Sequence, residues 1–98
     1  MSDTAFLETL QRVIDERLAA DAPAESYTAR LAREGVVKVA QKLGEEGVEL
    51  ALAAAAQDRE RVAAEAADLV YHLLLLLRLR DLRLEDVVAE LERRHAGR

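Results

Sequence analysis

Lys42-Leu43-Gly44-Glu45-Glu46-Gly47-Val48-Glu49 is followed, after an alanine-rich segment, by Glu65-Ala66-Ala67-Asp68. We predict two helices here, with a turn at Gln57-Asp58 between them. Successive helical residues turn by about 100°, so the three glutamates of the first cluster fall within an arc of about 100°. Glu65 and Asp68 are three apart and also share a face. Glu49 and Glu65 each lie roughly 10–12 Å from the turn, so antiparallel packing would bring four or five carboxylates together.

Two interpretations of this acidic cluster stay open from spacing alone. Acidic residues on helices commonly form a solvated face, and an isolated E-E-x-x-E pattern usually does so. Carboxylates facing one another from two helices would repel, and the repulsion grows when water is excluded. A divalent cation would reverse its sign, and Mg²⁺ takes oxygen ligands of this kind together with water and substrate phosphates.

Composition favours a single all-α domain over residues 1–98. The chain is 51% hydrophobic but only 3% aromatic, with one proline and four glycines, which is typical of helical proteins. The net charge is −5 and no basic stripe occurs, so nucleic-acid binding is disfavoured. There is no cysteine, which excludes disulfides and thiolate chemistry and fits a cytoplasmic protein. No signal peptide or segment long enough to span a bilayer is apparent.

Apolar spacing and capping residues predict a bundle of four to five helices. We expect helices from Asp3 or Thr4 to Ala20, from the N-cap Ser26 to Glu34, from Val36 to Gln57, from the N-cap Asp58 to Arg80, and from Leu84 onwards. The segment Leu69–Leu77 is apolar nearly all round and must be covered on every side. So short a chain offers too little cover, and we expect a homodimer or larger homo-oligomer to complete the bundle.

The acidic clusters and their surroundings resemble the phosphoribosyl-ATP pyrophosphohydrolase family, within the all-α nucleoside triphosphate pyrophosphohydrolases. The acidic pattern alone indicates only the superfamily. The narrower resemblance depends on Lys42-x-Gly44, on Tyr71-His72, and on two further segments, Ser26-Tyr27-Thr28 and Glu85-Asp86-Val87. The family usually has glycine where Asp81 stands, so the fourth helix here could end more loosely or run on.

The resemblance implies Mg²⁺-dependent hydrolysis of the α–β phosphoanhydride of phosphoribosyl-ATP, giving phosphoribosyl-AMP and pyrophosphate. It implies four Mg²⁺ ligands, which are Glu46, Glu49, Glu65 and Asp68. Glu45 would bind a second ion or orient water as general base. The expected phosphate contacts are basic residues before the cluster, namely Lys42, Lys38, Arg30 and Arg33.

Simpler interpretations accompany these roles. The lysines would equally form intrahelical ion pairs, and His72 among leucines would be a structural histidine. Gly44 and Gly47 inside a helix indicate a close approach of a ligand or another helix. The alternative functions are a sanitising nucleoside triphosphate pyrophosphatase of the same superfamily and a non-catalytic helical interaction module.

Overall fold

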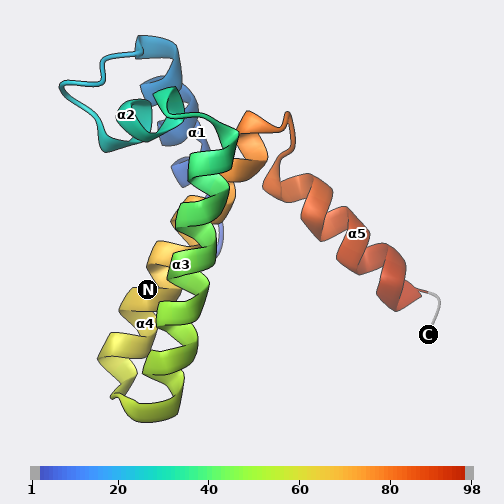
Figure 1. The fold of residues 1–98 in the computed structure, drawn as a ribbon. Helices are drawn as coiled ribbons and strands as arrows, with labels where there is room; N and C mark the ends of the chain where they lie inside the picture. The colour runs from blue at the N-terminus through green and yellow to red at the C-terminus, as the bar shows by residue number, and fades with distance from the viewer. Residues whose placement is uncertain (1–2, 97–98) are drawn as a thin grey trace.

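The computed structural model describes residues 3–96, and this part of the chain is entirely helical and turn (Figure 1). Five helices follow one another: α1 (Phe6–Ala20), α2 (Tyr27–Arg33), α3 (Val36–Ala56), α4 (Arg59–Leu79) and α5 (Leu84–Ala96). The all-α class is therefore confirmed. The helices fall where the sequence predicts them, with ends that differ by a few residues.

Helices α3 and α4 form an antiparallel hairpin, the most extensive helix–helix contact in the described chain (Figure 1). The turn lies at Gln57-Asp58, as expected. Gln57 is extended, and the Asp58 side chain accepts a hydrogen bond from the Arg61 N–H at 2.9 Å, which caps α4. The hairpin fixes the height of every α3 side chain relative to α4.

The core lies at the end of the hairpin away from its turn, where α1 and α2 pack against it. Its buried members come from α1, α2, α3 and α4, and they are Ile14, Leu31, Val39, Leu74 and Leu75. The apolar half of α4 therefore finds part of its cover inside the chain. Five leucines of α4 remain half-buried: Leu69, Leu73, Leu76, Leu77 and Leu79. None of the helices within residues 3–96 combines the length and the apolarity needed to cross a bilayer.

Helix α4 ends sharply, so neither of the two expectations for Asp81, a looser break or a longer helix, is correct. The Leu82 N–H donates to the Leu77 carbonyl at 2.8 Å, and the Asp81 N–H donates to the Arg78 carbonyl at 3.1 Å. These two bonds form a Schellman motif, which needs a left-handed residue just past the helix. Asp81 takes that conformation, with φ of 59°.

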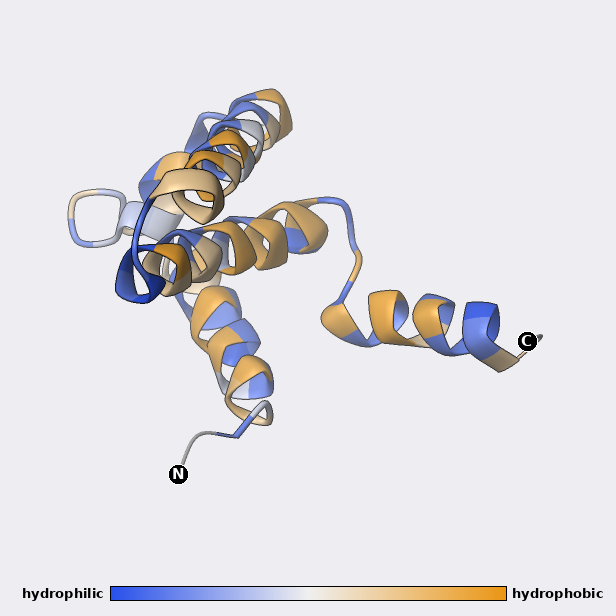
Figure 2. Ribbon diagram, turned by 90° about the horizontal axis from the view of Figure 1, so that it is seen from below, coloured by the Kyte–Doolittle hydropathy of each residue, from blue (hydrophilic) through white to orange (hydrophobic). Residues whose placement is uncertain are grey.

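Helix α5 is tied to α1 at its start and then leaves the rest of the molecule (Figure 1). The Gln11 side chain accepts from the Leu84 N–H at 2.7 Å and donates to Glu85, so a residue of α1 caps α5. No residue of α5 is buried. Figure 2 shows the helix standing apart with hydrophobic residues along much of its length.

No other part of the described chain comes unusually close to the backbone at Gly44 or Gly47 of α3. A Cβ on Gly44 would meet nothing within 4 Å, and one on Gly47 would lie 4.0 Å from a Leu69 methyl, an ordinary contact. The expectation of a closely approaching helix is therefore wrong at Gly44. Open space above Gly44 leaves room for a ligand.

Candidate metal and phosphate site

Three carboxylates from the two hairpin helices converge. Glu46 and Glu49 of α3 and Glu65 of α4 each offer an oxygen, and these atoms all lie within 4.8 Å of one another. Glu46 and Glu65 are 6% and 3% exposed, while Glu49 faces solvent. Glu49 and Glu65 lie at matching distances from the turn, which places these two acids together. Glu46 is three residues before Glu49 and shares its face of α3.

Both buried carboxylates are incompletely satisfied. Glu46 Oε2 and Glu65 Oε2 are buried and have no hydrogen-bond partner among the described residues, although buried polar atoms are normally paired. Burial raises the pKa of Glu46, and the charges of Glu49 and Asp68 raise it further. Burial also raises the pKa of Glu65, as do Glu49 and Asp68, with Arg61 opposing them. Carboxylates that converge and leave buried oxygens unpaired fit a hard divalent cation.

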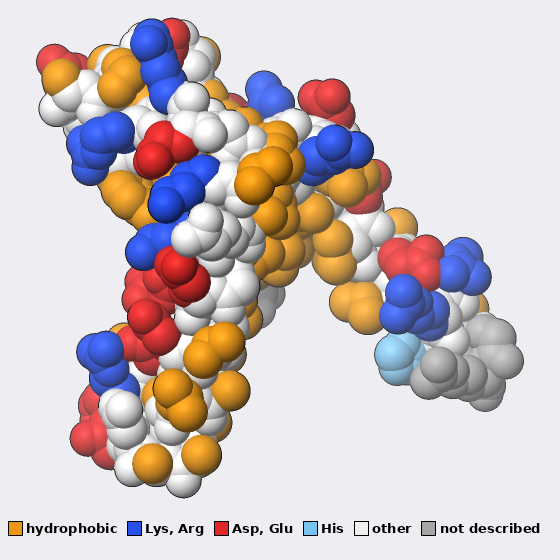
Figure 3. All heavy atoms as spheres, in the orientation of Figure 1, with side chains coloured by type: hydrophobic (Ala, Val, Ile, Leu, Met, Phe, Trp, Pro, Cys, Tyr) orange, Lys and Arg blue, Asp and Glu red, His pale blue; other side chains and the backbone are white. Residues whose placement is uncertain are grey.

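Each buried carboxylate has a basic neighbour one turn earlier on its own helix. Lys42 Nζ lies 3.9 Å from Glu46, and the Arg61 guanidinium lies 2.6 Å from Glu65. Because the helices are antiparallel, Lys42 flanks the cluster on the α2 side and Arg61 flanks it on the turn side. Figure 3 shows acidic side chains gathered on the α3–α4 hairpin, with basic side chains on either side of them. Sequence reasoning missed Arg61, although its i, i+4 spacing to Glu65 was a usable signal.

The other two acids expected in the site lie at its margin or outside it. Asp68 is exposed and is not one of the three converging carboxylates, yet its charge acts on both Glu46 and Glu65. Glu45 is also exposed, and its carboxylate accepts a hydrogen bond from Gln41 at 3.2 Å. One helical position therefore separates Glu46, which enters the cluster, from Glu45, which does not.

A hydrogen-bonded chain joins α2 to α4 beside the carboxylates. His72 is buried, and its Nδ1 lies 2.7 Å from the Asp68 carbonyl. A carbonyl only accepts, so Nδ1 carries the hydrogen, and in the neutral imidazole Nε2 then accepts from the Tyr27 hydroxyl, 2.9 Å away. Thr28 and Tyr71 form a second hydrogen bond between the same helices. Both ring nitrogens of His72 therefore have hydrogen-bond partners within the fold, which fits a structural role for this histidine.

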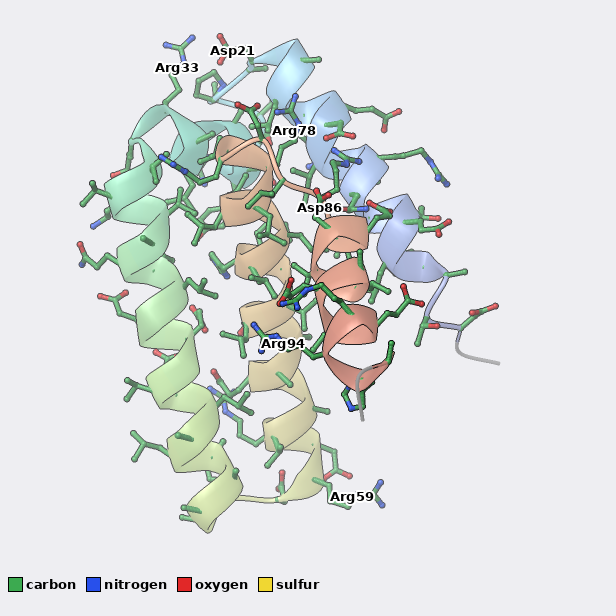
Figure 4. All side chains as sticks on the ribbon, turned by 90° about the vertical axis from the view of Figure 1, so that its right-hand side faces the viewer. Asp21, Arg33, Arg59, Arg78, Asp86 and Arg94 are labelled. Atoms are coloured by element: carbon green, nitrogen blue, oxygen red, sulfur yellow. The ribbon has the colours of Figure 1, made fainter. Side chains whose placement is uncertain are left out.

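The basic residues expected to contact phosphate are not equally placed. Arg30 stacks over the Tyr27 ring at 5.8 Å and donates to the Pro23 carbonyl, so it lies near the α2 side of the site. Lys38 is exposed one turn before Lys42. Arg33 instead makes two 3.0 Å hydrogen bonds to the exposed Asp21 carboxylate. Figure 4 shows this pair at the opposite end of the molecule from Arg59, which marks the hairpin turn.

The fold and the site thus define an all-α protein with a cluster of carboxylates inside a helical hairpin, and a basic side chain flanks this cluster on each side. A model of the phosphoribosyl-ATP pyrophosphohydrolase family matches residues 7–95, and the chain belongs to that family. The family is one of hydrolases that act on a phosphoanhydride bond.

Curated relatives agree with this assignment. The chain is 53% identical over 88 residues to the phosphoribosyl-ATP pyrophosphatase of Agrobacterium fabrum, a match that covers 90% of this chain and 81% of the relative. It is 51% identical over 94 residues to the histidine biosynthesis bifunctional protein HisIE of Yersinia pestis, covering 96% of this chain and 46% of the relative. The chain therefore spans about half the length of the bifunctional relatives it matches.

Proposed function

We propose that this protein hydrolyses the α–β phosphoanhydride of phosphoribosyl-ATP, giving phosphoribosyl-AMP and pyrophosphate in histidine biosynthesis. The observation that carries the proposal is the convergence of Glu46, Glu49 and Glu65, with two buried oxygens left unpaired. Family membership and the names of the relatives support the substrate. We assign residues 1–98 to one pyrophosphohydrolase domain. We expect it to act in the cytoplasm, where its nucleotide substrate would be made.

We assign the cation to Mg²⁺, held by Glu46, Glu49 and Glu65, with Asp68 completing the set from the margin. When bound, the ion neutralises charge on the phosphates and lowers the pKa of water. The carboxylates orient the reacting groups and exclude bulk water from the buried side of the site. Glu45 stays a candidate for orienting water from outside the cluster, once it is released from Gln41.

On the substrate side, we assign phosphate contacts to Lys42 and Arg30. Lys42 already neighbours Glu46, and Arg30 is held near the site by Tyr27. Lys38 extends the same line of positive charge along α3. We leave Arg33 out of the site because the Asp21 carboxylate takes both of its hydrogen bonds.

A turnover assay with phosphoribosyl-ATP, with and without Mg²⁺, tests this function. Metal-dependent release of pyrophosphate is expected, with unmodified nucleoside triphosphates hydrolysed far more slowly. Faster cleavage of aberrant nucleoside triphosphates in the same panel would favour a sanitising pyrophosphatase. No turnover of any nucleotide, together with no calorimetric binding of Mg²⁺ and nucleotide, would leave only the non-catalytic interaction module.

A further inference from the structure

Arg61 is placed differently from an ordinary surface arginine. Its side chain is 57% exposed, but the side chain of its partner Glu65 is only 4% exposed and belongs to the converging carboxylates. A guanidinium has five donors, and a single carboxylate oxygen accounts for the contact seen at 2.6 Å. The exposed side of the guanidinium is therefore available to a second anion.

A cavity of about 260 Å³ opens beside this arginine. Its lining comes from both hairpin helices and from the turn, and it consists of Glu49, Leu52, Ala53, Gln57, Arg61 and Glu65. Two of these residues are carboxylates of the cluster, so an anion entering here meets repulsion. Arg61 provides the positive charge in the lining, and Gln57 adds a neutral amide.

The cavity lies on the turn side of the carboxylates, whereas Lys42 and Arg30 lie on the α2 side. A polyphosphate crossing the cluster would therefore meet a basic side chain at each end. Arginine suits the second position because its fork donates two parallel hydrogen bonds to a phosphate.

We propose that Arg61 binds the polyphosphate of the substrate, and pyrophosphate after cleavage, from the turn side of the carboxylate cluster. The inference rests on the proposed function and adds a residue to the substrate site. Glu65 holds the guanidinium in place through their ion pair. If a cation took over the charge of Glu65, this ion pair would weaken and Arg61 would be free to bind the phosphate.

The test is a calorimetric titration with inorganic pyrophosphate at saturating Mg²⁺, using wild type, Arg61→Gln and Arg61→Lys. Losing one charged hydrogen-bond donor should weaken pyrophosphate binding about tenfold in Arg61→Gln. Arg61→Lys should recover part of the loss, because the charge returns without the fork. Arg59→Gln is the matched control, since Arg59 lies two residues away on α4 and lines a separate cavity with Glu60 and Ala63.

A titration with Mg²⁺ alone separates this role from an indirect effect through Glu65. Saturating metal removes any difference that arises only from metal affinity, so a persistent loss of pyrophosphate binding supports the proposal. Equal pyrophosphate affinity in wild type, Arg61→Gln and Arg59→Gln would overturn it. These titrations need no turnover, so they fail or succeed separately from the assay with phosphoribosyl-ATP.

Discussion

Folding buries the carboxylate of Glu46 beside other acids, which is electrostatically unfavourable. Its side chain is nearly buried, one of its oxygens has no partner among the described residues, and its pKa is raised by burial and by neighbouring acids. Burying a carboxylate in this way costs stability unless a charge is supplied. In the proposed function a bound cation would supply it, which would link metal affinity to folding stability at this residue.

We therefore predict that Glu46→Gln uncouples stability from metal. In wild type, Mg²⁺ at about 100 times its dissociation constant should stabilise the fold by about 2.7 kcal/mol, because only the native state holds the ligands together. For a domain of this size this corresponds to a rise in Tm of roughly 10 °C or more. Glu46→Gln should lose most of this rise, as measured by thermal unfolding with and without Mg²⁺, and its turnover should fall at least about a hundredfold.

The control for Glu46→Gln is Glu60→Gln, which changes an exposed carboxylate on α4 outside the cluster. It should keep both the metal-dependent rise in Tm and the turnover. An undiminished metal response in Glu46→Gln would show that this carboxylate is not a ligand.

Among the elements, α4 ends unusually, as α1 does, on a left-handed aspartate. Its C-terminal Schellman motif puts Asp81 in the left-handed region, at φ of 59°, where the position favours glycine. Left-handed backbone costs an ordinary L-residue roughly 1–2 kcal/mol, and aspartate somewhat less. The hydrogen bonds of the motif and the tie between α1 and α5 hold the turn despite this cost.

Replacing Asp81 by glycine should accordingly stabilise the protein by up to about 1 kcal/mol, because the local strain disappears while both motif hydrogen bonds remain. Urea unfolding measures the change. Asp21→Gly provides the comparison: Asp21 is also left-handed, at φ of 49°, but it holds Arg33. It should gain less than Asp81→Gly. A destabilised Asp81→Gly would show that the aspartate side chain supports the turn.

Across the whole molecule, a polar junction holds α1, α4 and the start of α5 together. The Asp15 carboxylate accepts two hydrogen bonds from Arg83, at 2.9 and 3.0 Å, and one from Arg78 at 3.0 Å. The hydrogen bonds from Arg83 are the main reason why the pKa of Asp15 is lowered, and Arg78 adds to the effect against some desolvation. Asp15 is about a third exposed, so solvent screening limits its contribution to about 1 kcal/mol or less.

The pH dependence of this junction follows from the direction of the shift. An acid with a lowered folded-state pKa adds stability that is fully present above its unfolded value, about 3.9, and is lost as the pH falls through its folded-state value. Wild type should therefore be more stable than Asp15→Asn at pH 6, and the difference should vanish towards pH 2. Chemical unfolding at a series of pH values measures it. A difference that stayed constant with pH would assign the effect to packing.

That the chain forms a homodimer or larger assembly stays a prediction. Val88 and Leu91 of α5 are 43% and 49% exposed, and Phe6 near the start of α1 is 62% exposed. A fully exposed apolar side chain gains about 1.5–3 kcal/mol when it is fully buried, so each of these half-exposed side chains would gain about half of that. We expect a homodimer or larger assembly in sedimentation at micromolar concentration, shifted towards monomer by Leu91→Glu. A stable wild-type monomer would contradict the expectation.

Local information in the sequence determined the helices and the heights of the acids. Apolar spacing, the caps Ser26 and Asp58, and a fixed rise per residue act over a few positions, so they can be predicted without the fold. The pairing of α3 with α4 follows from them, because the short turn leaves the two helices antiparallel. The convergence of Glu49 with Glu65 was predictable for the same reason.

Only the tertiary structure decided which face of each helix is buried. Glu45 and Glu46 are adjacent and chemically alike, yet packing buries Glu46 and leaves Glu45 in solvent beside Gln41. It likewise placed Arg33 against Asp21. Burial depends on neighbours distant in the chain, and the pKa values and unpaired oxygens of the candidate site depend on burial, so they could not be derived from local sequence.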